Sequence, residues 1–336
     1  MTLRLATRAT FALARRFIVA RGLEILVLQA SPLLGLVYGR SQSGIPDPLR
    51  MGALLLGSIF LTAHVFVFND WIGYESDAQD PSRARRAFGR AGIGKPTIGY
   101  AALMLLAFTG GGPTAAGAGI ALLSLVYSGS ARFGKTPFAA SANHLLGGSL
   151  HFLLGYTCCH SLDIRGGAIS LFFGLVFAGG HLTQEVRDCE GDRLNGIRTC
   201  AVAFGCRRAF AGSVWFFALA YSLAFVLAAL GILPPLLLCC PLLLLLHLMR
   251  ARRALRRGLD RDSALWMQRQ HRALFALVGL VMLLGESTPN PTQREQMAPR
   301  ESPRPPGARW LATVPASSEE SRALRLRTRL QPIPSP

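Results

Sequence analysis

Carboxylates gather in two short stretches of this chain, although acidic residues are scarce in it. The sequence has 18 Asp and Glu among 336 residues, and eight of them lie in "FVFNDWIGYESDAQD" (66–80) or in "HLTQEVRDCEGDRLNGIRT" (181–199). Each stretch follows a long apolar run. Carboxylates at membrane depth are energetically unfavourable and usually mark a functional site. These two stretches are therefore the first candidates for chemistry.

Helical spacing places most of these carboxylates on one face of each stretch, at about 100° per residue. The face of the first stretch, continued as a helix, is lined by Asn69, Asp70, Asp77 and Asp80. Gly73 lies in the middle of that face, and Glu75 points away. The face of the second stretch is lined by Glu185, Asp188 and Asp192, whereas Glu190 points away.

Two facing rows of carboxylates repel each other unless a cation lies between them. Oxygen ligands at this spacing suit Mg²⁺, which keeps several waters and takes a substrate phosphate as a further ligand. Neither carboxylate set includes His or Cys, which argues against zinc. Basic residues that could contact a diphosphate lie nearby: Arg83, Arg85, Arg86, Arg132, Lys135, Arg193 and Arg198. The residues therefore favour a site for Mg²⁺ and a diphosphate over two solvated loop faces.

The elements that must position these side chains are predicted to be membrane helices. The chain is 51% hydrophobic and only 16% charged, whereas soluble domains are about 25% charged. Several apolar runs approach the length that spans a bilayer. The nine candidate spans are 17–38, 51–73, 96–111, 113–129, 138–158, 166–186, 209–231, 233–249 and 273–285. The sequence predicts an all-α, polytopic membrane protein.

The net charge of +18 is interpreted as a topology signal. Connections on the side of the N-terminus hold 25 basic residues, and those on the opposite side hold three, Arg40, Arg50 and Arg165. By the positive-inside rule, the N-terminus and both acidic stretches face the cytoplasm. A basic chain without a soluble domain does not indicate nucleic-acid binding. We expect a multi-pass protein of the bacterial inner membrane.

Three regions are expected: a basic N-terminal flank (1–16), a transmembrane domain (17–285) and a disordered Pro- and Arg-rich tail (286–336). The flank is preferred over a transit peptide. The ninth run has only thirteen residues, and nine spans would place the Arg-rich tail outside. An incomplete last span and a shifted reading frame are both open explanations.

Histidines and cysteines on the apolar runs are expected to be structural. His64, His144 and His151 are predicted to be packed or hydrogen-bonded inside the bundle rather than to bind the acceptor. The adjacent pairs Cys158–Cys159 and Cys239–Cys240 fit neither a zinc site nor a disulfide framework, so we interpret them as small packing residues.

The two acidic stretches resemble the motifs of the UbiA-type superfamily of intramembrane prenyltransferases. The first motif of that family, N-D-x-x-D-x-x-x-D, corresponds to "NDWIGYESD" (69–77), and the second, D-x-E-G-D-R-x-x-G-x-R-T, corresponds to "DCEGDRLNGIRT" (188–199). The "YS…K" connection from Tyr127 to Lys135 also matches. The resemblance covers about residues 15–285.

The resemblance implies nine transmembrane helices around a central cavity. It also implies Mg²⁺-dependent transfer of a prenyl group from a prenyl diphosphate to an aromatic or other lipophilic acceptor in the membrane, as in quinone biosynthesis. Asn69, Asp70 and Asp77 would hold one Mg²⁺, and Asp188 and Asp192 a second; Asp80 and Glu185 are further candidate ligands. The diphosphate would be contacted by Arg83, Arg132, Lys135 and Arg198. The residues expected to be catalytic are Asp70, Asp77, Asp188 and Asp192.

Gly73 departs from the family pattern, which usually has Asp at this position. Asp80 could replace the missing ligand if the helix bends, water could fill the position, or activity could be weaker. Two other functions stay open: an ion-coupled transporter that uses intramembrane carboxylates, and a CDP-alcohol phosphotransferase, whose Asp residues lie in one motif. The sequence does not identify the acceptor; aromatic rings, porphyrin-type rings and lipid or sugar phosphates are all candidates.

Overall fold

A computed structural model describes residues 21–43, 47–73, 95–129 and 136–286 of the chain. Its α-helices are α2 (Ala30–Ser43), α3 (Pro48–Ile72), α5 (Lys95–Thr109), α6 (Gly111–Gly129), α7 (Ala139–Cys159), α8 (Ile164–Leu194), α9 (Cys200–Phe204), α10 (Cys206–Ala229), α11 (Cys240–Arg256) and α12 (Arg261–Glu286), and the 3₁₀ helix η2 (Pro235–Cys239) precedes α11. No strand occurs in these ranges, which confirms the predicted all-α fold.

The chain divides into two units, Met1–Thr288 and Pro289–Pro336, and every described residue belongs to the first. The predicted flank (1–16) and, apart from Glu286, the predicted tail (286–336) lie outside the described residues. The predicted properties of both segments therefore stay predictions.

Within the described ranges, five helices are long and apolar enough to cross a membrane. They are Arg21–Arg40, Pro48–Ile72, Ile164–Leu194, Cys206–Ala229 and Pro235–Arg256. The first includes α2 and the helical residues that precede it from Arg21. Helices α5, α6, α7 and α12 overlap the other four predicted runs, and the exact number of nine spans stays a prediction.

One predicted helix start was wrong, and a second helix extends beyond its apolar run, as the helical wheel of the second acidic stretch assumed. The run 273–285 is only the C-terminal part of α12, which begins at Arg261. The buried residues of α12 repeat every three or four positions along the whole helix. Its first half carries charged residues, so hydropathy alone does not reveal it as part of the helix. The run 166–186 continues in α8 to Leu194, so the second acidic motif remains helical. Both helices are therefore longer than their apolar segments.

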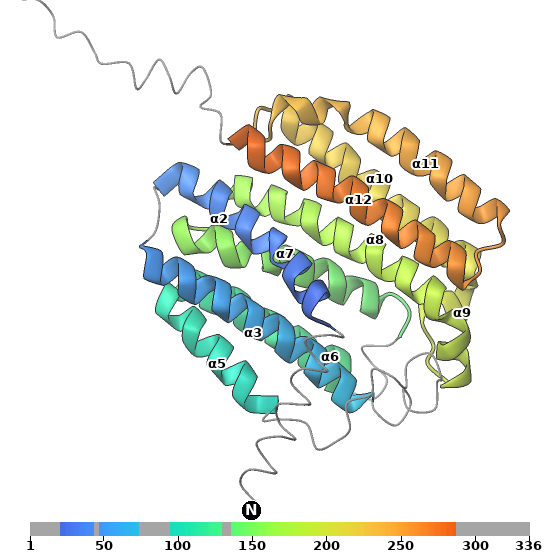
Figure 1. The fold of residues 1–336 in the computed structure, drawn as a ribbon, viewed down its shortest axis with the longest axis horizontal. Coiled ribbons are helices and arrows are strands. Elements are labelled where there is room, and N and C mark those ends of the chain that lie inside the picture. The colour runs from blue at the N-terminus through green and yellow to red at the C-terminus, as the bar shows by residue number, and fades with distance from the viewer. Residues whose placement is uncertain (1–20, 44–46, 74–94, 130–135, 287–336) are drawn as a thin grey trace, which may run out of the picture. The chain divides into compact units, whose positions relative to one another are not determined.

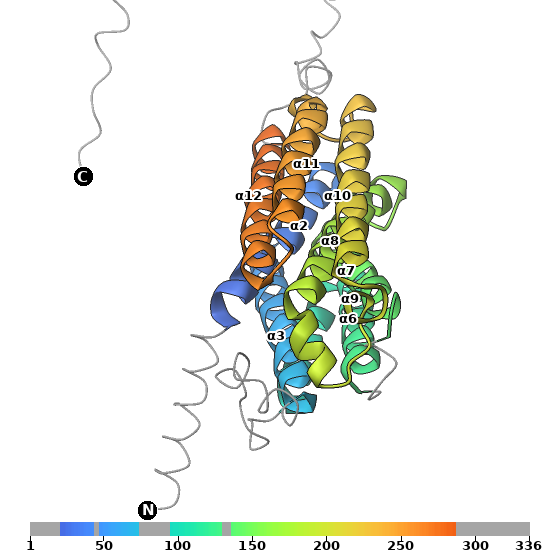
Figure 2. The same cartoon turned by 90° about the vertical axis from the view of Figure 1, so that its right-hand side faces the viewer.

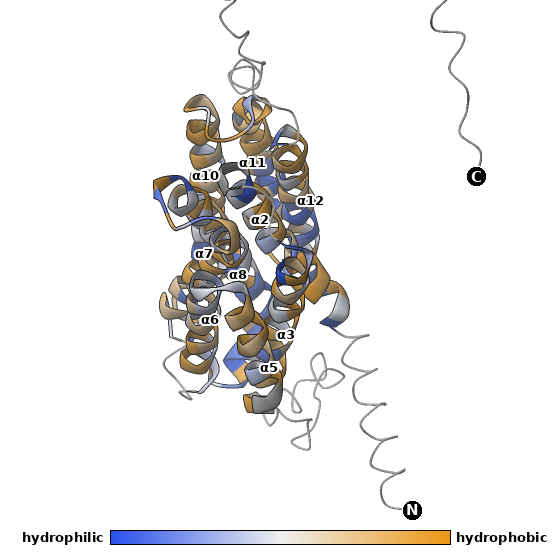
Figure 3. Cartoon of the chain, turned by 90° about the vertical axis from the view of Figure 1, so that its left-hand side faces the viewer, coloured by the Kyte–Doolittle hydropathy of each residue, from blue (hydrophilic) through white to orange (hydrophobic). Residues whose placement is uncertain are grey.

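Helices α7 and α8 lie in the middle of this unit. Helix α7 packs against α2, α6 and α8, and α8 also contacts α10 and α12. Figure 1 shows α3, α5 and α6 on one side of this pair and α10, α11 and α12 on the other, and in Figure 2 α3 and α6 lie below α10, α11 and α12. Large apolar side chains such as Met104, Trp215 and Leu242 are exposed, and apolar residues dominate the helices in Figure 3. Such an exposed apolar surface is typical of a face that contacts lipid.

Glycines allow α2 and α7 to approach closely. A Cβ atom on Gly155 would collide with the backbone oxygen of Pro32, and one on Gly35 would collide with that of Phe152. Small residues at such contacts are a common basis of helix packing in membranes, where the hydrophobic effect does not drive helices together. The position of α7 between the two halves therefore depends on these residues.

We predict that Gly155→Leu destabilises the detergent-solubilised protein by at least about 1–3 kcal/mol, because a side chain at this position overpacks a backbone contact. Thermal unfolding would measure the effect. The matched control is Gly147→Leu on the same helix, where an added Cβ meets nothing within 4 Å. Equal melting temperatures for the two variants would contradict the proposed packing role.

Candidate active site

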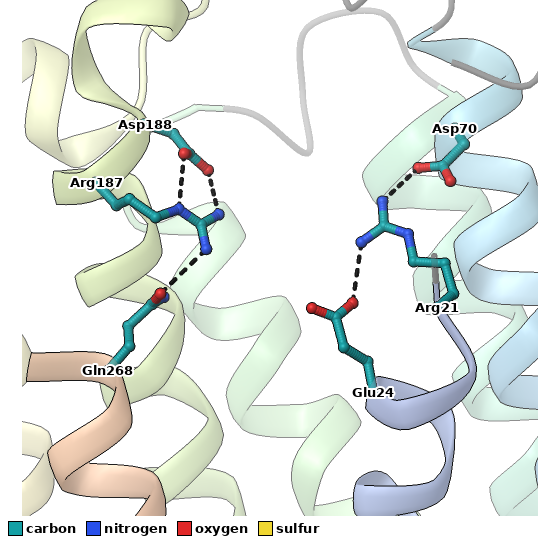
Figure 4. Close-up of polar contacts among 6 residues, drawn as sticks. All are labelled: Arg21, Glu24, Asp70, Arg187, Asp188 and Gln268. Carbon is teal, nitrogen blue, oxygen red and sulfur yellow. Dashed lines mark hydrogen bonds and ion pairs between the residues drawn. The ribbon is translucent and has the colours of Figure 1, made fainter. Parts of the chain in front are cut away.

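The carboxylate of Asp70 lies at the end of α3 and is paired with an arginine from the N-terminal helix. Its side chain is 5% exposed, and Arg21 Nη2 donates a hydrogen bond of 2.8 Å to its Oδ1. The same guanidinium donates through Nη1 to Glu24, at 3.0 Å. Figure 4 shows Arg21 between these two acids. Neighbouring Asn69 accepts a hydrogen bond of 3.4 Å from Ser128 Oγ of α6. Three elements therefore meet at the first acidic motif: the helical segment that begins at Arg21, helix α3 and helix α6.

Gly73 ends helix α3. It is the C-cap residue, and its N–H donates to the carbonyl oxygen of Asn69 at 2.9 Å. The rest of the predicted acidic face follows Gly73 in the chain and lies outside the described residues. Five of the predicted site residues lie outside the described residues: Asp77, Asp80, Arg83, Arg132 and Lys135.

Gly73→Asp is predicted to be tolerated or beneficial. The backbone angles at Gly73, φ −78° and ψ −2°, are accessible to any L-residue, and a carboxylate here would restore the family's oxygen ligand. We expect the variant to reach half-maximal diphosphate release at an equal or lower Mg²⁺ concentration than the wild type. Loss of activity in a variant that is still folded would contradict this prediction.

The second motif lies on the last turns of α8, where its carboxylates are arranged as the helical wheel predicts. Glu185 and Asp192 are buried, Asp188 is half-buried, and Glu190 is exposed on the other face. Helix α8 begins at Asp163, which caps it by accepting a hydrogen bond from Gly166 N at 2.7 Å. Arg198 follows the helix and is exposed.

Asp188 is also paired with an arginine. Arg187 Nε donates to Asp188 Oδ1 at 2.8 Å, and Arg187 Nη2 contacts the other carboxylate oxygen. Arg187 Nη1 donates to the amide oxygen of Gln268 on α12, at 3.1 Å. Figure 4 shows this group and the Arg21–Asp70 pair in one view. Each acidic motif thus has a cation in contact with one of its carboxylates.

Glu185 differs from Asp188 because one of its oxygens contacts the backbone of α9 rather than a neighbouring arginine. The backbone N–H of Ala201, in α9, donates to Oε2 at 3.3 Å, and Oε1 lies 3.0 Å from Nε2 of His181. Helix α9 begins at Thr199, whose hydroxyl accepts a hydrogen bond from Val202 N. Glu185 therefore links the first turn of α9 to α8, and its role as a Mg²⁺ ligand stays a prediction.

We predict that Glu185→Ala loosens α9 without changing the Mg²⁺ requirement. The amide of Ala201 loses its acceptor, so its hydrogen exchange should accelerate, by about tenfold if the net hydrogen bond contributes about 1.4 kcal/mol. Exchange followed by mass spectrometry would detect this change. Glu190→Ala, an exposed acid on the same helix, is the control. An increased Mg²⁺ requirement in Glu185→Ala would instead identify this residue as a metal ligand.

The sequence model of the UbiA prenyltransferase family matches residues 31–278. The chain belongs to this family. A search of curated proteins found no significant match to the chain. Membership in the UbiA family, together with the five apolar helices, makes the protein an integral, multi-pass membrane protein.

Solved structures of UbiA proteins share its fold. A UbiA homologue from Archaeoglobus fulgidus bound to DMAPP and Mg²⁺ is 17% identical, with a TM-score of 0.61 over 82% of this chain and 100% of that one. A digeranylgeranylglyceryl phosphate synthase is 16% identical, with a TM-score of 0.62 over 82% and 99%. The apo structure of a UbiA homologue from Aeropyrum pernix K1 is 15% identical, with a TM-score of 0.59 over 77% and 97%.

The chemistry of the donor set in this UbiA protein suits Mg²⁺. The described members of the two motifs offer carboxylate and amide oxygens, the ligands that Mg²⁺ prefers. Among the residues that the structure describes, no three His, Cys, Asp or Glu side chains come close enough together to hold a metal ion by themselves. Asp77 lies outside those ranges. A magnesium site would therefore combine the described acids with ligands from substrate, water or the connection after α3.

Sequence reasoning missed several polar partners of the motifs. Arg21 and Arg187 were counted as topology charges, and Gln268 was not singled out. Arg187 could have been suspected because it precedes Asp188 directly. No sequence signal links Arg21 with Asp70 or Gln268 with Arg187, because these partners come from helices far apart in the chain.

The histidines expected to be structural do have packing or hydrogen-bond partners. His151 Nε2 lies 3.2 Å from Ser58 Oγ, His144 Nδ1 lies 2.8 Å from the carbonyl oxygen of Ala140, and the ring of His64 stacks on that of Phe68. All seven cysteines are free, as expected for packing residues. His181, which the sequence reasoning did not consider, stacks on His144.

Proposed function

We propose that this UbiA-family protein transfers a prenyl group from a prenyl diphosphate to a lipophilic acceptor within the membrane. The observation that carries the proposal is the pairing of each acidic motif with an arginine, Arg21–Asp70 at 2.8 Å and Arg187–Asp188 also at 2.8 Å. Mixed acids and arginines at the ends of membrane helices suit a ligand that brings both cations and anionic phosphates.

The proposed ligands are Asn69, Asp70 and Asp77 for one Mg²⁺ and Asp188 and Asp192 for a second, and these ions would neutralise the diphosphate as it leaves. The UbiA homologue from Archaeoglobus fulgidus binds Mg²⁺ with DMAPP in one structure and with GPP in another, which supports this assignment. We omit Glu185 from the set because it anchors α9. Asp80 stays a further candidate.

Arginine and lysine side chains around the acids would bind the phosphate oxygens. Arg83, Arg132, Lys135 and Arg198 are the proposed diphosphate ligands, and the guanidinium group matches phosphate geometry in bidentate contacts. In the structure, Arg21 and Arg187 hold Asp70 and Asp188 in place. These contacts keep two of the acids oriented before a substrate arrives.

The bundle supplies the dry surroundings that an allylic cation requires. Away from the acidic motif, toward the middle of the bundle, many side chains of α7 and α8 are apolar and buried, such as Phe152, Phe173 and Leu182. An apolar chain of the prenyl group would lie among such side chains, with its diphosphate at the polar helix ends. The proposed acceptor is an aromatic ring, as in quinone biosynthesis, and the proposed orientation places the acidic helix ends at the cytoplasmic face of a bacterial inner membrane.

The test is release of diphosphate and formation of a prenylated product by the purified full-length protein. Radiolabelled geranyl diphosphate would be supplied with Mg²⁺ or with EDTA, and with 4-hydroxybenzoate, 1,4-dihydroxy-2-naphthoate, haem or geranylgeranylglyceryl phosphate as the acceptor. We expect Mg²⁺-dependent release that Asp77→Ala abolishes. Ion uptake into vesicles without any diphosphate release would support a transporter and contradict the proposal.

A further inference from the structure

A cluster of one tyrosine ring and two histidine rings, of which His181 is buried and the other two are half-buried, lies beside the second acidic motif, where three helices meet. His144 of α7 and His181 of α8 stack in parallel, with ring centroids 3.7 Å apart and an interplanar angle of 9°. Tyr127 of α6 presents its edge to both rings, at 5.4 Å and 6.3 Å. No role proposed above for the acids or the arginines uses these three rings.

One hydrogen bond fixes the tautomer of the neutral His144 ring. Its Nδ1 lies 2.8 Å from the carbonyl oxygen of Ala140, one turn earlier on α7. A carbonyl oxygen can only accept, so Nδ1 carries the hydrogen and Nε2 of a neutral ring keeps a free electron pair. His144 is half-buried. A neutral imidazole with an acceptor nitrogen is a general base.

His181 lies close to an acid on its own helix. Its Nε2 lies 3.0 Å from Glu185 Oε1, and the second oxygen of Glu185 accepts from the backbone of α9. The side chain of His181 is 7% exposed. The stack on His181 of α8 and the hydrogen bond to Ala140 of α7 therefore orient the His144 ring by contacts from two helices.

The position of the pair relative to the acids fits the acceptor side of the reaction. His181 precedes Asp188 by seven residues on α8, which places the rings about 10 Å, two helical turns, from the carboxylate level. Tyr127 belongs to the helix that leads to Arg132 and Lys135. A substrate whose diphosphate lies at the acids would extend its reactive carbon toward this cluster. The ring faces and edges of the cluster suit contacts with a flat aromatic acceptor.

We propose that His144 accepts the proton that a hydroxylated aromatic acceptor loses during prenyl transfer, with His181 and Glu185 as its positioning residues. The inference rests on the proposed function. In this step the bond between C1 of the prenyl group and the diphosphate oxygen breaks, and its electron pair leaves with the diphosphate. A new bond forms between C1 and the acceptor, and the proton of the attacking atom moves to Nε2 of His144.

The test compares His144→Gln with the wild type, because a glutamine amide can still donate to Ala140 but does not act as a base. Diphosphate release and prenylated product are measured in the same reaction, with geranyl diphosphate and Mg²⁺ and with 4-hydroxybenzoate or 1,4-dihydroxy-2-naphthoate. We expect the ratio of product to released diphosphate to fall by about 100-fold, within the range for loss of a general base, while geraniol from reaction with water accumulates.

A matched control excludes a merely structural effect. His151→Gln changes a buried histidine two turns further along α7, whose Nε2 is already engaged by Ser58, and it should leave the ratio unchanged. His181→Phe keeps a ring in the stack but loses the contact with Glu185, and we expect an intermediate ratio. Thermal unfolding verifies that each variant is folded.

The possible outcomes separate the two proposals. Absence of diphosphate release by the wild type contradicts the proposed function itself. Normal release with an unchanged product ratio in a folded His144→Gln variant overturns the role of His144. Normal release without product from either aromatic probe also overturns it, because the inference commits to an aromatic acceptor.

Discussion

Asp188→Asn is expected to lower Mg²⁺-dependent diphosphate release by more than about 100-fold and to leave the fold intact. Loss of a residue that only supports a metal ligand already lowers affinity or activity by about 10–100-fold, and Asp188 is proposed as a ligand itself. Asparagine retains the size of the side chain and one oxygen that Arg187 can still reach. The substitution therefore removes the charge with little change in packing.

Glu190→Gln is the matched control for this prediction. Glu190 lies two residues later on α8 and is exposed on the opposite face, so its neutralisation should change release by less than about twofold, consistent with the small effects of exposed sites. Initial rates at saturating geranyl diphosphate, measured over a series of Mg²⁺ concentrations, would separate weaker metal binding from slower chemistry. Equal losses in the two variants would indicate that charge alone, and not position, determines activity.

Arg21→Met is expected to destabilise the protein without Mg²⁺ by about 3–5 kcal/mol, the range for removal of one partner from a buried ion pair. The side chain of Arg21 is 13% exposed and that of Asp70 is 5% exposed, so the remaining carboxylate keeps its charge in poor contact with water. Methionine preserves the apolar length of the arginine side chain.

Mg²⁺ should partly restore the stability of Arg21→Met, because the ion would replace the positive charge that the substitution removes from beside Asp70. We expect the rise in melting temperature on addition of Mg²⁺ and geranyl diphosphate to be larger in Arg21→Met than in the wild type. Leu23→Met, an exposed position on the same helix, controls for the added side chain. An Arg21→Met variant as stable as the wild type would show that the pair with Asp70 is unimportant for the fold.

The spacing of polar and apolar residues predicted the type of fold and the face of α8 that carries the acids. Glu190 is exposed and Asp192 is buried, as a period of 3.6 residues requires. The same reasoning placed the start of α12 too late, because hydropathy finds apolar segments and not amphipathic ones. The predicted continuation of the first acidic face beyond Gly73 lies outside the described residues.

The partners of the acids could not be predicted, because they depend on tertiary contacts. Arg21 lies 49 residues before Asp70, and Gln268 lies 81 residues after Arg187. The stack of His144 on His181 likewise joins two helices. A single sequence contains the residues of such contacts but no periodicity that reports which helices are neighbours.

The central claim is that the acids of α3 and the acids of α8 bind the same diphosphate through Mg²⁺. The most direct measurement is calorimetric titration of a non-hydrolysable geranyl thiolodiphosphate into the wild type, Asp70→Asn and Asp188→Asn, each with Mg²⁺ and with EDTA. We predict that only the wild type with Mg²⁺ binds the analogue tightly. Either substitution should weaken binding by at least about tenfold, which is the lower end of the range for loss of a residue that supports a metal ligand. Mg²⁺-dependent binding that remains at wild-type strength in either variant would contradict the claim.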